Sequence, residues 1–380
     1  MKIAVIGGKL QGVEAAYLAK KAGWEVIVID HNPNVPAETI GDSFVQLDVN
    51  SDKGFREIIA NCQLVIPALE DKKALESISQ VADRVGVPLA FDVAAYQISS
   101  SKAASNNLFQ KLAVPIPELW PKCCFPVIVK PLDSSGSEGV RCLKNSEDWK
   151  KWVKSAGNFE DWVIQEFITG PSYSIEVIGC QGRYQPFQVT ELEMDKIFDC
   201  KRVIAPARID IEMIKEFENI GVKIAQALEL EGIMDVEVIL HDGKLKVLEI
   251  DARLPSQTPT AVYHSTGVNM VQILGMNFGY NKLKPVADCC VQRGVVYEHV
   301  KVSSEKMEIC GEHVMGTAGP LKLQEGFFGA DEALTNYEQG KKNWVATLIN
   351  TGNSFVEAWE KRNRVLKNIA RESHLLGWED

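Results

Sequence analysis

Short apolar strands alternate with helices over the first 95 residues, and this alternation restricts the fold more than any other feature of the chain. Helices are predicted at 13–22 and 72–85. Strands are predicted at 2–6, 24–29, 44–47, 63–67 and 89–91. Strands that take turns with helices are typical of a parallel sheet with helices packed on its faces. The sequence therefore predicts an α/β fold at the start of the chain.

A polar stretch at 99–107 separates this unit from a β-rich part of the chain. A helix is predicted at 102–112, and the proline-rich segment 114–121 ends it. The next strands are predicted at 127–130, 139–143, 162–167, 174–178 and 184–191. A long helix at 211–228 precedes a hairpin. The clearest features after residue 279 are a strand at 294–300 and a basic helix at 354–369.

Composition limits the classes of partner. The 380 residues are 46% hydrophobic and 24% charged, which is ordinary for a folded chain of two or three domains. A net charge of −10 argues against nucleic acid. No apolar run reaches the ~20 residues that span a membrane, and the start of the chain lacks a secretory signal. Cysteine pairs at 123–124 and 289–290, without a Cys-x-x-Cys spacing, fit free thiols in a reducing cytoplasm.

A glycine turn, Gly7–Gly12, lies between the first strand and the first helix. Glycines at this place let the backbone approach a ligand, and a helix N-terminus favours anions. A nicotinamide-binding turn would carry glycine where Lys9 stands, although Asp30 at the end of the second strand is placed to bind a ribose in such a fold. The turn therefore fits a bound carboxylate or phosphate, a purely structural turn, or a dinucleotide.

Residues 232–253 predict a β-hairpin with carboxylates on one face. We expect a three-residue loop, His241–Gly243, which pairs Leu240 with Lys244. Period-two alternation then gives one apolar face, made of Val236, Val238, Leu240, Leu248 and Ile250. The opposite face carries Asp235, Glu237, Glu249 and Asp251. A two-residue loop would instead place Glu237 and Glu249 on different faces.

Carboxylates that face one another repel, so this hairpin predicts a bound cation. Oxygen ligands without His or Cys favour Mg²⁺ or Mn²⁺, and Mg²⁺ commonly binds substrate phosphates as well. The alternative is a solvated hairpin whose outer face is acidic. Upstream features suit phosphate: Lys102, an apolar strand ending in Lys130, and a serine-glycine loop at 134–139. Each of these alone fits a surface residue or a flexible loop, and it is their order that makes the combination specific.

These motifs together resemble the ATP-grasp superfamily of carboxylate–amine ligases. The motifs are Ser101-Lys102, Val127–Pro131, Ser134–Gly139, Gln165–Gly170, and Glu237 with Glu249–Arg253. Within this superfamily the chain is most similar to the ligases of pyrrolysine biosynthesis, which join 3-methyl-D-ornithine to the side-chain amine of L-lysine. The segments that carry this similarity are 6–12, 232–237 and 249–263. The resemblance covers roughly residues 1–280.

The resemblance implies an α/β ATP-grasp fold that follows an N-terminal Rossmann-like domain. The implied parts are the Rossmann-like domain at 1–97, a small lobe with its lead-in helix at 98–170, a large lobe with the metal hairpin at 171–285, and a C-terminal region at 286–380. It also implies ATP and two Mg²⁺ ions as cofactors, with Mn²⁺ as an alternative ion. The implied partners are small-molecule substrates, with no nucleic acid and no membrane.

The same resemblance implies roles for individual residues. Catalysis would use Arg253 and Lys130. The nucleotide would contact Lys102, Lys130, Ser134, Ser135, Gly136, Gln165, Glu166, Phe167 and Ile168. The metal ligands would be Glu237, Glu249 and Asp251. The diamino acid would contact Ser174, Glu176, Asp235, Ser256, Gln257, Thr258, Pro259, Thr260 and Ala261, and the lysine substrate Leu10, Gln11 and Glu70. The chain departs from the pattern at Ser172, where many members carry a ribose-binding glutamate.

The implied reaction attaches the γ-phosphoryl group of ATP to the substrate carboxylate, and the amine then displaces phosphate from this acyl phosphate. Arg253 would stabilise the oxyanion and the departing phosphate. Three alternatives remain within and outside the superfamily. One is an ATP-grasp ligase of the D-alanine–D-alanine or biotin-dependent carboxylase type, and another is a nicotinamide-dependent oxidoreductase. A nucleotide-sensing protein without activity is a third.

Overall fold

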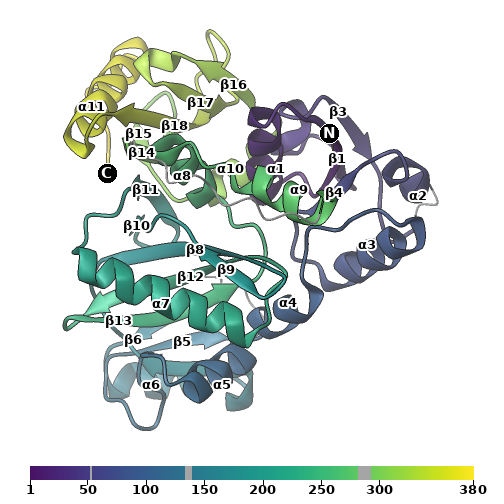
Figure 1. Ribbon diagram of the computed structural model, residues 1–380. Helices are drawn as coiled ribbons and strands as arrows, with labels where there is room; N and C mark the ends of the chain where they lie inside the picture. The colour runs from purple at the N-terminus through teal and green to yellow at the C-terminus, as the bar shows by residue number, and fades with distance from the viewer. Residues whose placement is uncertain (52–53, 133–138, 281–291) are drawn as a thin grey trace.

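A computed structural model describes residues 1–51, 54–132, 139–280 and 292–380, and Figure 1 shows their arrangement. The predicted nucleotide-binding residues Ser134, Ser135 and Gly136 lie outside the described residues. Among the described residues, no helix is both long and apolar enough to cross a bilayer.

The N-terminal part is a parallel sheet flanked by helices, as the alternation predicts. Its elements are β1 (Lys2–Ile6), α1 (Leu10–Lys21), β2 (Glu25–Asp30), the 3₁₀ turn η1 (Pro36–Thr39), β3 (Ser43–Gln46), α2 (Gly54–Ile59), β4 (Leu64–Pro67) and α3 (Lys72–Val85). In the described part of the chain the strand order is β3-β2-β1-β4. This is the order of one half of a doubly wound fold.

The predicted strand at 89–91 is wrong. Leu89 makes a single parallel bridge to Val65, and the chain then enters the helix α4 (Val93–Ser99). Asp92 caps this helix, because its side chain accepts a hydrogen bond from the Ala95 N–H at 2.9 Å. The capping residue stops the strand before it can pair further.

The glycine turn before α1 is dictated by close packing. Gly7 has φ +106°, and a Cβ atom there would lie 2.3 Å from the Ala68 carbonyl oxygen. Asp30, considered above for a ribose, accepts the Gly8 N–H at 2.8 Å through one oxygen and the Asn32 N–H at 2.8 Å through the other. This use of both carboxylate oxygens holds the turn in place and accounts for Asp30 without a dinucleotide.

A small three-stranded sheet follows, built on helices that connect it to the rest of the chain. Its elements are α5 (Lys102–Leu112), β5 (Val127–Pro131), β6 (Arg141–Leu143), α6 (Ser146–Val153), the 3₁₀ turn η2 (Phe159–Asp161) and β7 (Trp162–Glu166). The described strands are ordered β6-β5-β7. A separate apolar cluster that includes Val127, Val129 and Trp152 packs beneath this sheet.

The largest sheet carries the hairpin and continues into the C-terminal region. The strands of its first part are β8 (Ser172–Cys180), β9 (Arg183–Pro186), β10 (Thr190–Met194), β11 (Cys200–Ala205), β12 (Gly232–His241) and β13 (Lys244–Asp251). The helix α7 (Ile211–Ala227) precedes β12, and the helices α8 (Thr258–Thr266) and α9 (Met270–Tyr280) follow β13. The strands of its second part are β14 (Gly294–Val302), β15 (Met307–Ile309), β16 (Lys322–Glu325), β17 (Glu332–Thr335) and β18 (Trp344–Gly352). Between and after them lie α10 (His313–Gly316), the 3₁₀ turn η3 (Phe327–Gly329) and α11 (Phe355–Glu372). Because β11 pairs with β14, both parts form one sheet (Figure 1).

Two features of this sheet differ from the sequence prediction. The single strand expected at 184–191 is two strands, β9 and β10, which both pair with β8. Pro186 ends the first of them, because proline has no N–H to donate to a neighbouring strand. The strand β11 and the strands β15 to β18 were not predicted.

The hairpin loop also differs from the prediction. His241 pairs with Lys244, so the loop has two residues, Asp242 and Gly243, both with positive φ. The register then shifts at Leu248: Val238 pairs with Val247, whereas Glu237 pairs with Glu249. This bulge inserts one residue and reverses the parity that the short loop would have given. The carboxylate pairs therefore share a face, although the loop prediction was wrong, and the apolar face near the loop carries Leu245 and Val247.

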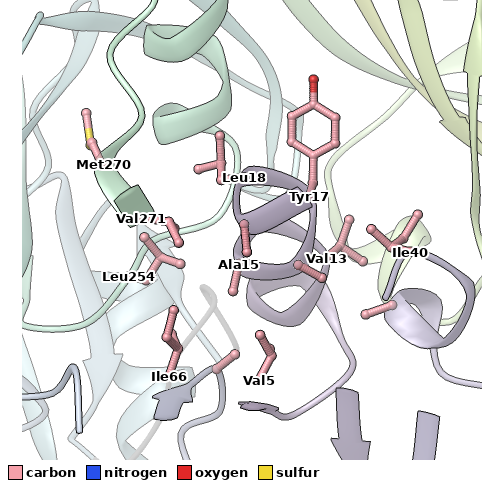
Figure 2. Close-up of a cluster of buried hydrophobic side chains, with 14 of the residues drawn as sticks. Val5, Val13, Ala15, Tyr17, Leu18, Ile40, Ile66, Leu254, Met270 and Val271 are labelled. Carbon is pink, nitrogen blue, oxygen red and sulfur yellow. The ribbon is translucent and has the colours of Figure 1, made fainter. Parts of the chain in front are cut away.

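One hydrophobic core joins the N-terminal part to the large sheet. Figure 2 shows Ala15 and Leu18 of α1 on the side of Leu254, which follows the hairpin, and of Met270 and Val271 of α9, whereas Val13 lies toward Ile40. These residues are at most 8% exposed. The same cluster includes residues of β14 and β18. The glycine turn and the hairpin are therefore held at a fixed distance from each other.

Buried ion pairs attach α11 to the sheet. The Glu298 carboxylate on β14 accepts Arg202 Nε at 2.9 Å and Arg362 Nε at 2.8 Å. All three side chains are at most 3% exposed. Two guanidinium groups on one fully buried carboxylate satisfy its hydrogen-bonding capacity, which a buried charge requires.

Candidate functional site

A cavity of about 1350 Å³ lies where the glycine turn, the hairpin and the start of α8 meet. The predicted residues in its wall are Leu10, Gln11, Glu70, Ser174, Asp235, Glu237, Glu249, Asp251, Arg253, Ser256, Gln257 and Thr258. Four other predicted residues, Glu176, Pro259, Thr260 and Ala261, adjoin these along β8 and α8 but are not part of the wall. The structure thus brings together the residues proposed for metal and for both substrates.

Three neighbouring strands align the carboxylates. Across β12 and β13, Asp235 pairs with Asp251 and Glu237 with Glu249. On the other side of β12, Asp235 faces Glu176 of β8. Directly opposed residues in antiparallel strands place their Cβ atoms ~4.5–5.5 Å apart, so their side chains interact. The sheet thus concentrates negative charge on one of its faces.

This concentration raises the pKa values of the carboxyl groups. Burial is the main cause at Asp235, where repulsion from Asp251 and Glu237 raises the pKa further. The pKa of Glu237 rises to about 8 through desolvation and repulsion from Glu249, against an opposing effect of Lys130. Desolvation also raises the pKa of Asp251 to about 6, although Arg253 lowers it. The face therefore favours bound protons or cations.

The donor set fits a hard divalent cation. Asp235 Oδ1 and Asp251 Oδ1 are buried and lack a hydrogen-bond partner within the described residues. Across the ranges that the structure describes, no three His, Cys, Asp or Glu side chains converge into a ready cage for a metal ion. A complete cage is not needed for Mg²⁺, which usually binds one or two carboxylates and takes its remaining ligands from water and phosphate.

Arg253 connects the hairpin to the N-terminal domain. One of its terminal nitrogens lies 2.7 Å from Asp251 Oδ2 and 2.7 Å from Glu70 Oε1. Gln11, at the start of α1, donates to the same Glu70 oxygen at 3.1 Å. The carboxylates raise the pKa of Arg253, so its charge persists at any physiological pH. Of the residues proposed for the lysine substrate, Glu70 thus contacts the proposed catalytic arginine directly, and Gln11 contacts Glu70.

The proposed nucleotide residues that the structure describes lie on or just after the strands of the small sheet and at the start of its lead-in helix. Lys102 is the first residue of α5, and Lys130 lies on β5, close enough to Glu237 to favour its charged form. Glu166 ends β7 and accepts Lys246 Nζ of β13 at 2.7 Å. Lys246 was not predicted. It ties the strand that would line adenine to the acidic hairpin.

Segment 256–261 forms the start of α8 and is held from three sides. Ser256 Oγ donates to Glu312 Oε2 at 2.7 Å, and the Thr260 N–H donates to Glu14 Oε1 at 2.6 Å. Gln257 Oε1 lies 3.1 Å from His299 Nε2. Glu14, His299 and Glu312 come from α1, β14 and the loop before α10, and sequence reasoning missed all three. A histidine within the apolar run of β14 was the one local signal of a buried polar contact.

Glu14 gives a pH-dependent prediction. Its side chain is 3% exposed, and burial raises its pKa from 4.5 to about 8. Below pH ~4.5 the Glu14 carboxyl group is protonated in both the folded and the unfolded chain. Above this pH it ionises first in the unfolded chain, which favours unfolding. The free energy of unfolding therefore falls as the pH rises toward 8. Glu14→Gln keeps an acceptor for Thr260 but cannot ionise. We expect its melting temperature to fall less than that of the wild type between about pH 5 and pH 8.5, by several degrees.

The control for this measurement is Glu76→Gln, which changes an exposed glutamate on α3. Its melting curve should follow the wild-type pH dependence. Parallel curves for Glu14→Gln and the wild type would contradict the assigned burial effect.

Comparison with known families gives two matches. An ATP-grasp domain model matches residues 99–257, and a model described as PylC-like, N-terminal domain matches residues 3–90. A 3-methyl-D-ornithine–L-lysine ligase of Methanosarcina mazei is 32% identical over 368 residues, which are 96% of this chain and 94% of that protein. The ligase of the same name from Methanosarcina acetivorans is 36% identical over 316 residues, covering 82% of this chain and 83% of that one.

A solved structure shows the same fold. The biotin carboxylase domain of 2-oxoglutarate carboxylase from Hydrogenobacter thermophilus, crystallised with MgADP, ADP and bicarbonate, superposes with a TM-score of 0.71. The superposition covers 96% of this chain and 89% of that chain at 14% sequence identity. Identity this low supports the shared fold alone.

Proposed function

This chain belongs to the ATP-grasp family of ligases, and on that premise we propose that it couples the carboxylate of one amino acid to the amine of another at the expense of ATP. The proposed acid is 3-methyl-D-ornithine or D-ornithine, and the proposed amine is the side chain of L-lysine. The Methanosarcina relatives carry this activity in their names and align over most of the chain.

One observation carries the proposal: the acidic strands β12 and β13, Arg253 and the start of α8 border a single cavity with the N-terminal turn. A site for three reactants needs opposite charges close together, because ATP brings negative charge and diamino acids bring positive charge. Carboxylates without a metal can pair with ammonium groups, and the same carboxylates can hold a metal against phosphate.

Glu237, Glu249 and Asp251 would hold Mg²⁺, and we propose two ions, with Mn²⁺ as a substitute. When bound, such ions neutralise charge on transferring phosphate and orient it. Lys102 on α5 and Lys130 on β5 would add positive charge, while Gln165–Ile168 would line the adenine. Ser134, Ser135 and Gly136 keep their proposed phosphate role as an expectation from sequence.

The residues of the chain would then position the reacting groups. Arg253, fixed by Asp251 and Glu70, would hold its guanidinium toward the oxygen that becomes negative when the amine attacks. Asp235, with Glu176 beside it on β8, would provide negative charge for the ammonium groups of the diamino acid, which orients its carboxylate. Glu70, with Gln11, would hold the lysine substrate on the opposite side of Arg253.

The proposal is tested by identifying the product. Purified protein with ATP, Mg²⁺, D-ornithine and L-lysine should yield a compound whose mass is that of the two amino acids less one water. One ADP and one phosphate should appear for each amide, because the carboxylate is activated by phosphoryl transfer. Mass spectrometry with phosphate release measures both.

Omission of L-lysine and replacement of D-ornithine by L-ornithine serve as controls, and both should abolish the amide. ADP release that depends on D-alanine or bicarbonate, with no D-ornithyl-lysine amide, would contradict the proposed substrates in favour of another ATP-grasp reaction. ATP binding without turnover of any pair would favour a nucleotide sensor.

A further inference from the structure

The segment Ser256–Thr258 adopts a backbone conformation that side chains of L-amino acids rarely take. Gln257 has φ +70° and ψ −59°, and the Thr258 N–H donates to the Ser256 carbonyl oxygen at 2.8 Å. These values define a classic γ-turn, which is rare and strained for a residue other than glycine. Strain of this kind persists only where surrounding groups impose it, and it gathers at functional sites.

The turn faces the cavity. Ser256, Gln257 and Thr258 all belong to the cavity wall, beside Asp235 and Arg253. Because Gln257 is 4% exposed, its side chain is held within the protein while its backbone shapes the wall. A group that holds the Gln257 side chain in place therefore also holds the backbone of this part of the cavity wall.

His299 is the group that receives the Gln257 side chain. Its ring is 2% exposed on β14, with Nε2 3.1 Å from Gln257 Oε1 and Nδ1 2.9 Å from Thr347 Oγ1 of β18. His299 and Thr347 pair directly across the two strands. The ring thus stands between a rigid sheet and the strained turn.

The partners of His299 determine which of its two ring nitrogens carries the proton. Gln257 turns its amide oxygen Oε1 toward His299 Nε2 at 3.1 Å, and an amide oxygen can only accept a hydrogen bond. His299 must therefore donate from Nε2, and its Nδ1 accepts the Thr347 hydroxyl. Burial lowers the pKa of His299 to about 3, which keeps the ring neutral and this proton arrangement constant.

We infer that His299 is a positioning residue: by donating to Gln257 it holds the strained turn in the shape that presents Ser256–Thr258 to the diamino-acid substrate. This inference rests on the proposed function, which places that substrate at the turn. His299 itself is not in the cavity wall, so its effect passes through Gln257. The turn should relax when the donor is lost, and the affinity for the diamino acid should fall more than that for the other substrates.

The test compares KM values for D-ornithine, L-lysine and ATP in four variants. His299→Leu removes both hydrogen bonds and should raise the KM for D-ornithine by on the order of tenfold to 100-fold, with the KM for ATP and for lysine within twofold of wild type. His299→Gln places an amide N–H near the position of Nε2 and should recover most of the loss. Thr347→Val removes the group that orients the ring and should give an intermediate value.

Asn350→Leu is the matched control, since Asn350 is fully buried on the same strand as Thr347 and its amide makes no hydrogen bond within the described residues. It should leave all three KM values unchanged. If His299→Leu does not fold, Thr347→Val and His299→Gln still decide the question. Equal rises in all three KM values, or no recovery in His299→Gln, would overturn the inference.

The outcome separates this inference from the proposed function. Wild-type protein that forms no amide from D-ornithine and L-lysine would refute the proposed function. Wild-type protein that forms it, with an unchanged KM for D-ornithine in His299→Leu and Thr347→Val, would refute the positioning role alone.

Discussion

Glu249→Ala should reduce ATP-dependent amide formation at least about 100-fold while leaving the protein as stable as the wild type or more so. Glu249 pairs with Glu237 across β12 and β13, and its charge raises the pKa of that neighbour. Its loss removes a proposed metal ligand, and catalysis that relies on the ion to neutralise phosphate loses that support. The same loss relieves repulsion in the ligand-free protein, which explains why activity and stability should change in opposite directions.

Amide yield by mass spectrometry and melting temperature by calorimetry check both parts. Glu325→Ala is the control, because Glu325 is exposed on β16, away from the cavity wall. It should match the wild type in both measurements. Full turnover in Glu249→Ala would remove the basis for a metal site on this hairpin.

Arg253→Ala should lower turnover by on the order of 100-fold to 1000-fold, the usual cost of removing a group that stabilises developing negative charge. Here the ligand-free protein should also lose stability. Asp251 and Glu70 share the Arg253 guanidinium, and its removal leaves their charges uncompensated in the cavity wall. The loss of stability should be larger at high pH, where Asp251 cannot avoid its charge by keeping a proton.

Arg253→Lys keeps the charge but not the planar guanidinium group, so it should recover stability more than activity. Steady-state rates and melting temperatures at about pH 6 and pH 8 distinguish the two effects. A turnover in Arg253→Ala within tenfold of the wild type would show that Arg253 holds the two domains together without acting in the reaction.

The α/β fold, the ATP-grasp family and the ligase class could be predicted from the sequence, and the comparisons confirm them. The common face of Glu237 and Glu249 was predicted from the wrong loop. A two-residue loop and a bulge at Leu248 together give the same parity as a three-residue loop without a bulge. Alternation specifies which residues share a face, but a bulge also depends on contacts outside the hairpin, such as the Val247 N–H that donates to the Pro115 carbonyl oxygen at 2.8 Å.

Glu14, His299 and Glu312 could not be predicted, because no local spacing connects them. They converge on segment 256–261 only after three distant elements have packed together. Glu14 lies among the apolar residues of α1, and the sequence of this helix does not show that the buried carboxyl group has the Thr260 N–H as its hydrogen-bond donor. The domain boundaries and the individual substrate contacts remain predictions.

The hydrophobic core around α1 is shared between the N-terminal part of the chain and the large sheet. Ala15 and Leu18 face Leu254 and Val271, so an excised N-terminal segment would expose to water apolar surface that is now covered. We therefore expect a large-to-small substitution deep in α1, such as one at Leu18, to destabilise the large sheet as well as the N-terminal part.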